Sequence, residues 1–224
     1  MKNMAEMDVI ILSNAHLPLL EEYTRETIRT CIQSDAQVKF NFVVIEQQEG
    51  IDYDVPTYHV KEPFNYNRFM NFGISKGKSE FVVICNNDLF FQRSWASNII
   101  VAMRNNNLLS ACPICPHTQG TRKYKEDVNY GYAIREEVSG WCWVLKREVF
   151  EIIGEIKWHP QLPFWYSDNI LARQLKSHGI KHALIKNSIV THRGSQTINR
   201  KENNHDWTMG SWAIFDRLCK QGVL

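Results

Sequence analysis

The chain has 224 residues, of which 44% are hydrophobic and 22% are charged, and its formal net charge is +2. This length and apolar content suffice for one sizeable core, so we expect a single globular domain. The mild charge argues against a protein that coats nucleic acid, although Arg122, Lys123 and Lys125 form a small basic cluster.

Two further features bear on the compartment. No apolar run approaches the roughly 20 residues of a membrane span, and "MKNMAEMDVIILSN" lacks the pattern of a signal peptide, so we expect a cytoplasmic protein. Six cysteines without a signal sequence predict reduced thiols. Cys112 and Cys115 have the spacing of a zinc knuckle, but no second pair completes it. We therefore favour small buried thiols over a zinc or redox site.

The first half of the chain alternates predicted strands and helices. Apolar periodicity predicts strands at 8–13, 40–46, 80–85 and 108–112. It predicts helices at 19–33 and 66–77, the second closed by Gly77, and a third that Ser94 caps and that runs through Met103. This βαβα order predicts a mostly parallel sheet with helices on both faces.

The second half is less regular. Residues 118–137 are polar and numerous enough to predict a functional or mobile loop, which could close over the substrates. An aromatic strand at 140–146 follows, in which alternation places Trp141 and Trp143 on one face. Helices at 147–153 and 167–179, the strand-like pieces "HALIK" and "SIVTH", and an amphipathic segment around "WAIFDRLCK" complete the chain.

Polar side chains follow the predicted strands at the points where those strands end. They are Ser13 and Asn14, Glu46, Asn86, Asn87 and Asp88, and His192. Because ligands bind at the carboxyl ends of parallel strands, we expect this set to form a site. A carboxylate, an imidazole and amides suit Mg²⁺ or Mn²⁺ holding a phosphate. Each residue alone is also an ordinary turn residue, so only the set is informative.

Three stretches of this sequence resemble the family-2 glycosyltransferases of GT-A fold. "YNRFMNFGISKGKSEFVVICNNDLFF" is similar to the helix and strand that lead into the family's Asp-x-Asp motif. "VSGWCWVLKREVFEIIGEI" resembles its Ser-Gly segment and the helix that follows. "FWYSDNILARQLKSHGIKHALIKNSIVTHRGSQT" resembles its Glu-Asp-x-Asp helix and terminal histidine motif. Agreement of several motifs in the right order, over roughly residues 8–197, is more specific than any one of them.

The resemblance implies an architecture. We expect an α/β, single-domain GT-A (Rossmann-like), mostly parallel sheet flanked by helices, with a small antiparallel element in the C-terminal half. Residues 1–112 would form the nucleotide-sugar-binding half and residues 113–200 the acceptor-side and catalytic half. Residues 201–224 would be a C-terminal tail and helix.

The resemblance also implies roles for individual residues. Asp88 and His192 would hold the metal, and Asn86 stands at the first acidic position of the motif. Asp168 would be the catalytic base, although Ser167 and Ile170 replace the family's neighbouring acids. The donor site would comprise Ser13, Asn14, Glu46, Arg68, Asn71, Asn87, Gly140 and Trp141.

The activity implied is that of a metal-dependent, inverting glycosyltransferase. It would move a sugar from a nucleoside diphosphate sugar, by preference a UDP-sugar, to an acceptor hydroxyl, with Mn²⁺ or Mg²⁺ stabilising the departing diphosphate. Asp168 at a helix N-terminus would stay ionised and could accept the hydroxyl proton, or it could be a simple helix cap. The tryptophans 141, 143 and 165 and Tyr166 could contact sugar or belong to the core.

Two alternatives remain open. A nucleotidyltransferase could use a similar sheet, but "SNAHLPLL" after the first strand lacks the glycine-rich phosphate loop of such enzymes. A binding domain that has lost its activity is suggested by Asn86 and Ile170. The acceptor is a glycan, a small molecule or, with less support, a modified nucleic-acid base.

Overall fold

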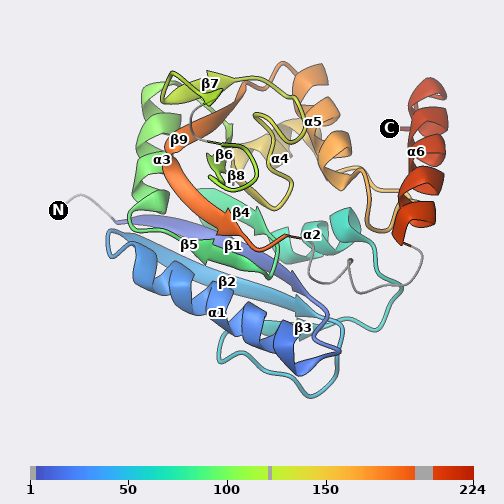
Figure 1. Cartoon of the computed structure of the whole chain (residues 1–224), viewed down its shortest axis with the longest axis horizontal. Coiled ribbons are helices and arrows are strands. Elements are labelled where there is room, and N and C mark those ends of the chain that lie inside the picture. Colours follow the sequence, from blue (N-terminus) through green and yellow to red (C-terminus); the bar gives the residue numbers. More distant parts are fainter. Residues whose placement is uncertain (1–3, 121–122, 195–203) are drawn as a thin grey trace.

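The computed structural model describes residues 4–120, 123–194 and 204–224 (Figure 1). The N-terminal half alternates strands with helices, and its predicted elements are confirmed to within about three residues. In chain order these elements are β1 (Ala5–Ser13), α1 (Pro18–Ser34), β2 (Val38–Glu46), β3 (Thr57–His59), α2 (Tyr66–Ile74) and β4 (Phe81–Cys85). The three-residue β3 was not predicted, since so short a run carries no periodicity.

The C-terminal half continues the sheet with shorter strands and more varied pairing. In chain order its elements are β5 (Leu89–Phe91), α3 (Trp95–Asn105), β6 (Ser110–Ile114), β7 (Val128–Tyr130), β8 (Cys142–Lys146), α4 (Glu148–Ile153), α5 (Ser167–Ser177), β9 (His182–His192) and α6 (Asn204–Lys220). Among the described helices, none has the length and apolar character that crossing a membrane requires.

The nine strands of the described residues form a sheet in the order β3-β2-β1-β4-β8-β6-β9-β5, with β7 paired to β9. Strands β3, β2, β1 and β4 are parallel neighbours. Strand β8 runs antiparallel between β4 and β6, and β5 and β7 run antiparallel to β9. The predicted parallel sheet with an antiparallel element in its C-terminal half is therefore confirmed.

Two apolar cores lie on the two faces of the sheet, as side-chain alternation along a strand requires. In β1, Val9 and Ile11 pack in a core with residues of α1 and α3, whereas Ile10 and Leu12 pack in a core with residues of α2 and α5. Figure 1 shows the helices divided between the two sides of the sheet. Because both faces are covered, the central strands are continuous apolar runs.

The amino-terminal edge of the parallel strands contains a buried ion pair. The Asp8 carboxylate accepts hydrogen bonds from Arg147 Nη2 (2.6 Å), from Ser79 N (2.7 Å) and from Ser79 Oγ (2.6 Å). A Cβ at Gly77 would lie 2.2 Å from Asp8 Oδ2. Gly77 is therefore needed for this close approach. It does not end α2, which stops at Ile74.

The polar segment 118–137 differs from the predicted mobile loop. Its residues Val128–Tyr130 form β7 and pair with Ala183–Ile185 of β9. Gln119 Nε2 donates to the Glu136 carbonyl (2.6 Å) and to Ser139 Oγ (2.8 Å), so the start and end of the segment are also joined. None of its described residues lines the main pocket. The described part of the segment is thus hydrogen-bonded to the sheet and to itself, and its closure over substrates stays a prediction.

Three local predictions also need correction. The pieces "HALIK" and "SIVTH" are one strand, β9, with a bulge where its register with β6 shifts from Ile185 to Ile189. Ser94 does not cap α3 with its side chain; Asp35 Oδ2 accepts from Ser97 N (2.8 Å) instead. Trp143 packs in the core beside α2, whereas Trp141 packs against the opposite core, because Trp141 precedes the regular part of β8.

Candidate active site

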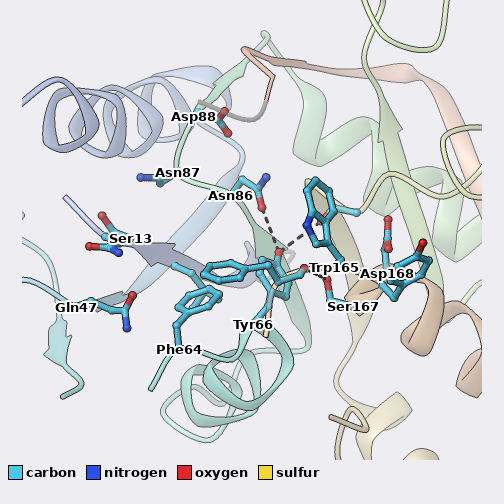
Figure 2. A pocket seen from close by; sticks show the side chains of 15 residues that line it. Ser13, Gln47, Phe64, Tyr66, Asn86, Asn87, Asp88, Trp165, Ser167 and Asp168 are labelled. Atoms are coloured by element: carbon cyan, nitrogen blue, oxygen red, sulfur yellow. Dashed lines mark hydrogen bonds between the residues drawn. The ribbon is translucent and has the colours of Figure 1, made fainter. Parts of the chain in front are cut away.

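A pocket of about 200 Å³ opens at the carboxyl ends of β1 and β4 (Figure 2). Its walls come from the residues after β1 and after β4, from Gln47, Phe64, Tyr66 and Gly140, and from the segment 164–168 that leads into α5. Of the predicted site residues, Ser13, Asn14, Asn87, Asp88, Gly140 and Asp168 line this pocket. The position agrees with the expectation for a parallel sheet.

The "NND" step is positioned by the short strand that follows it. Strand β5 pairs with the end of β9, and this register sets Leu89 opposite His192. Asp88 Oδ1 consequently lies 3.2 Å from His192 Nε2. The contact does not meet the geometry of a hydrogen bond, and each atom is buried without a hydrogen-bond partner among the described residues. A sequence run that breaks into polar residues and turns apolar again is therefore a strand end followed by a second strand.

Threonines of α1 contact the same segment, residues 86–89, through hydrogen bonds. Thr24 Oγ1 accepts a hydrogen bond from Asn87 Nδ2 (3.0 Å), and Thr27 Oγ1 accepts from Leu89 N (3.0 Å) and donates to Leu89 O (3.1 Å). Both threonines are fully buried. Sequence reasoning missed these residues, although buried hydroxyls at a spacing of three on one helix face were a usable signal.

Glu46 has a different place from the one predicted. Its side chain is fully buried and does not line the pocket. It accepts hydrogen bonds from Ala15 N (3.1 Å), Gln48 N (2.8 Å) and Tyr53 Oη (2.7 Å). Glu46 therefore joins the segments that follow β1 and β2. Ser13 is part of the same network through Tyr53 Oη (3.0 Å).

Arg68 and Asn71 also lie outside the pocket lining. Asn71 exchanges two hydrogen bonds with the Ile156 backbone, of 2.8 and 3.0 Å. Arg68 pairs with Glu62 and lies over the Trp158 ring, 5.3 Å from its centroid. These contacts connect α2 to neighbouring loops, so any role toward a donor is indirect.

Trp141 contacts the predicted metal ligand and does not line the pocket. Its ring stacks on that of His192 with a centroid separation of 5.6 Å and an interplanar angle of 18°. Its carbonyl oxygen accepts a hydrogen bond from Asn86 N (2.9 Å). Trp141 thus restricts the orientation of the His192 imidazole and fixes the start of the "NND" step.

Asp168 lies in the first turn of α5. Its carboxylate accepts from Asn169 N (2.9 Å) and approaches Gly140 so closely that a Cβ there would lie 2.6 Å from Oδ2. Burial raises the pKa of Asp168 above its ordinary value, in spite of these backbone hydrogen bonds. Burial thus opposes the effect of the helix N-terminus, which by itself would favour the ionised form. A raised pKa nevertheless brings a carboxylate closer to the range that suits proton transfer.

Aromatic rings form the wall of the pocket near Asp168. They are Phe64, Tyr66, Phe164, Trp165 and Tyr166. Phe64 and Phe164 stack with centroids 4.6 Å apart, and Tyr166 stacks on Phe215 of α6 at 4.7 Å. Tyr166 has a φ of 65°, which is a costly conformation for an aromatic residue and is typical of functional sites. Phe64 and Phe164 were missed because they belong to no periodic segment.

The cysteines lie apart from this chemistry. All six are unpaired, and five are buried. Burial raises the pKa of Cys112, and a protonated thiol is a poor metal ligand and a poor nucleophile. Within residues 4–120, 123–194 and 204–224, no three His, Cys, Asp or Glu side chains gather in a cluster that could hold a metal ion.

Comparison with solved structures shows which architecture this is. The chain superposes on GalNAc-T7, crystallised with UDP, GalNAc and Mn²⁺, with a TM-score of 0.67, 13% identity and coverage of 86% of this chain and 44% of that one. The chain has the GT-A glycosyltransferase fold. The expected fold class is thus confirmed. No protein-family model matches the sequence, and comparison with curated proteins gave no match.

Two further GT-A structures have similar values. Residues 1–349 of Staphylococcus aureus TarS match with a TM-score of 0.62 and 10% identity, covering 83% of this chain and 59% of that one. The mannosyltransferase PcManGT from Pyrobaculum calidifontis, in complex with GDP-Man and Mn²⁺, matches with a TM-score of 0.63 and 13% identity, covering 90% of this chain and 59% of that one. This chain spans only about half the length of these neighbours. Identities this low establish the fold alone.

Proposed function

We propose that this chain is a metal-dependent glycosyltransferase domain that moves a sugar from a UDP-sugar to an acceptor hydroxyl with inversion of configuration. One observation carries the proposal: Asp88 Oδ1 and His192 Nε2 lie 3.2 Å apart and are buried without a hydrogen-bond partner among the described residues, and Asp88 lines a pocket that Asp168 also lines. Figure 2 shows Asp88 and Asp168 on opposite sides of that pocket.

The residues at the Asp88 end fit a divalent cation. A buried carboxylate oxygen without a donor is costly, and a cation would supply the missing partner for it and for the imidazole nitrogen. With two protein ligands, the remaining positions of Mn²⁺ or Mg²⁺ are left for diphosphate oxygens and water. When bound, such an ion stabilises the charge that develops on the departing diphosphate. Two of the structural neighbours were crystallised with Mn²⁺, one together with UDP and the other with GDP-Man.

The chain's own residues have separate tasks in this proposal. Ser13, Asn14 and Asn87 line the same side of the pocket as Asp88 and would orient the nucleotide. Asp168 would accept the proton of the acceptor hydroxyl at its carboxylate as the hydroxyl attacks the anomeric carbon. Attack from the side opposite the leaving group produces inversion. The aromatic wall would exclude water and pack on the apolar face of the sugar.

The test combines binding with turnover. Calorimetry should show UDP binding that depends on Mn²⁺, and a UDP-sugar with Mn²⁺ should be hydrolysed slowly or transferred once an acceptor is found. A screen that includes GDP-mannose examines the choice of nucleotide. An NMR spectrum of the fresh product reports its anomeric configuration, and retention would contradict the inverting part of the proposal.

The alternatives give different results in the same assays. A nucleotidyltransferase would release pyrophosphate from UTP and a sugar 1-phosphate. A binding domain would show Mn²⁺-dependent UDP affinity with no hydrolysis or transfer by any donor. The second result would leave the donor site in place and overturn the proposed enzyme.

A further inference from the structure

Trp165 contains a polar atom that the fold leaves without a partner. Its indole Nε1 is buried and has no hydrogen-bond partner among the described residues. An indole N–H can only donate a hydrogen bond. Unlike a hydroxyl it cannot rotate, and unlike an imidazole it cannot change tautomer, so it needs an acceptor at this position. Buried donors in native proteins are nearly always paired, and an exception calls for an explanation such as a missing ligand.

The surroundings of Trp165 indicate where that ligand lies. Trp165 lines the pocket, and Figure 2 shows its indole between Asn86 and Asp168. Beside it, the Tyr66 hydroxyl makes only long contacts, 3.3 Å to Asn86 Oδ1 and 3.4 Å to the Gly140 carbonyl. Two polar groups in this stretch of wall thus lack a short hydrogen bond. The stretch separates the cation side of the pocket from the carboxylate of Asp168.

We infer that the Trp165 N–H binds a hydroxyl of the transferred sugar and makes the enzyme select donors that carry this hydroxyl. The inference rests on the proposed function, since a sugar attacked by an Asp168-activated hydroxyl must lie between Asp168 and the diphosphate. A sugar hydroxyl accepts from the indole and can donate its own proton to the Tyr66 oxygen. It therefore supplies both partners that this wall lacks. Because Nε1 is covered in the free protein, a small rotation of the indole accompanies binding.

Trp143 is an internal control for this reading. Trp143 is more deeply buried than Trp165, and its Nε1 donates a 2.7 Å hydrogen bond to the buried Ser110 Oγ. Phenylalanine at 143 would break a good buried bond and lower stability. Phenylalanine at 165 would remove a donor that has no hydrogen-bond partner in the described part of the chain. The melting temperature of Trp165→Phe should equal or exceed that of the wild type, whereas the loss of a structural hydrogen bond would lower it.

The experiment uses Trp165→Phe, Trp143→Phe and the wild type, with UDP, UDP-glucose, UDP-galactose and the monodeoxy analogues of both sugars, all with Mn²⁺. Wild-type affinity for UDP is measured first, because its absence would overturn the proposed function itself. The wild type should then disfavour one monodeoxy donor by about 10- to 100-fold. Trp165→Phe should keep the wild-type affinity for UDP. Its affinity for the parent UDP-sugar should fall by a similar factor, and it should no longer discriminate against the disfavoured monodeoxy analogue.

Other outcomes overturn the inference. If Trp165→Phe keeps the wild-type discrimination among the monodeoxy donors, the indole N–H does not recognise the sugar. A loss of stability and of UDP affinity in Trp165→Phe would assign the indole to the scaffold. Trp143→Phe should lower the melting temperature and leave the discrimination unchanged, and a matching loss of discrimination there would show that the assay reports packing only.

Discussion

The amino ends and the carboxyl ends of the parallel strands each bury an aspartate, but the two carboxylates differ in how fully they are hydrogen-bonded. At the amino-terminal edge, Asp8 is 2% exposed and accepts three hydrogen bonds, from Arg147 and Ser79. At the carboxyl edge, Asp88 is 4% exposed, yet its Oδ1 has no hydrogen-bond partner among the described residues. The two carboxylates are therefore alike in burial and differ in the completeness of their hydrogen bonding, which is why we propose a functional role for Asp88 and a structural one for Asp8.

The physical reason is the cost of removing a carboxylate from water. That cost is tolerated when donors or an opposite charge replace the water, as they do at Asp8. At Asp88 the replacement is incomplete, and the same holds for His192 Nε2 and Trp165 Nε1. Asp88 and Trp165 line the pocket, and in the proposed function a bound ligand supplies the missing partners.

The largest effect that would test this contrast is expected for Asp88→Asn. If Asp88 supplies the charged ligand of the cation, the variant should fold normally and lose Mn²⁺-dependent UDP binding altogether. Calorimetry with and without Mn²⁺ measures this, with the melting temperature as a control for folding. A folded variant with unchanged Mn²⁺-dependent affinity would contradict the metal site.

Asp168→Asn should lower kcat by about 10² to 10⁴ and leave the affinity for UDP-sugar near that of the wild type, because a general base acts in the transition state. Asparagine remains a good residue for a helix start, so stability should not fall. Removing a buried ionisable group whose pKa is raised should, if anything, stabilise the protein at neutral pH. Near-normal turnover would assign Asp168 to helix capping.

At the amino ends of the parallel strands, Asp8→Asn should lower the stability of the protein and leave ligand binding unchanged. Removal of the charge leaves Arg147 without its partner, and the expected loss is about 3 kcal/mol, low for a buried pair because Arg147 keeps contact with water. Urea unfolding measures it. The UDP affinity of the folded fraction should match the wild type, and a change there would show that the two edges are coupled.

His192→Ala should weaken Mn²⁺-linked UDP binding by about tenfold, less than Asp88→Asn, since water can replace one neutral ligand. Trp141→Leu offers a matched comparison, because Trp141 stacks on the imidazole without lining the pocket. Its effect on binding should be smaller still. A loss at His192 that equals the loss at Asp88 would reverse the ranking of the two ligands.

The smallest effect concerns pH. Because burial raises the pKa of Asp168, the fraction of the ionised base should fall at a higher pH than for an ordinary aspartate. Turnover should therefore decline as the pH drops through that raised pKa, by about tenfold per unit below it. The Asp168→Asn variant should show no such decline. A wild-type profile that is flat down to the ordinary range of an aspartate would contradict a role for this group.

Much of the fold could be predicted because it depends on local patterns. Buried parallel strands are short apolar runs, and helices carry a period of 3.6, so β1, β2, β4, α1 and α5 follow from the sequence. The rule that ligands bind at the carboxyl ends of such strands then locates the pocket and places Asp88 in it. The order of the motifs suggested the GT-A fold, which the solved structures confirm.

What only the tertiary structure decided are the contacts between distant segments. The pairing of β5 with β9 brings His192 to Asp88, and a three-residue strand leaves no periodic signal from which to predict it. The same limit applies to Glu46, whose hydrogen bonds go to Ala15, Gln48 and Tyr53. It also applies to Trp143 and Trp165, because the N–H of Trp143 meets Ser110 whereas that of Trp165 has no partner among the described residues. Residue type states which bonds a side chain can make, whereas packing of remote segments determines which of them are made.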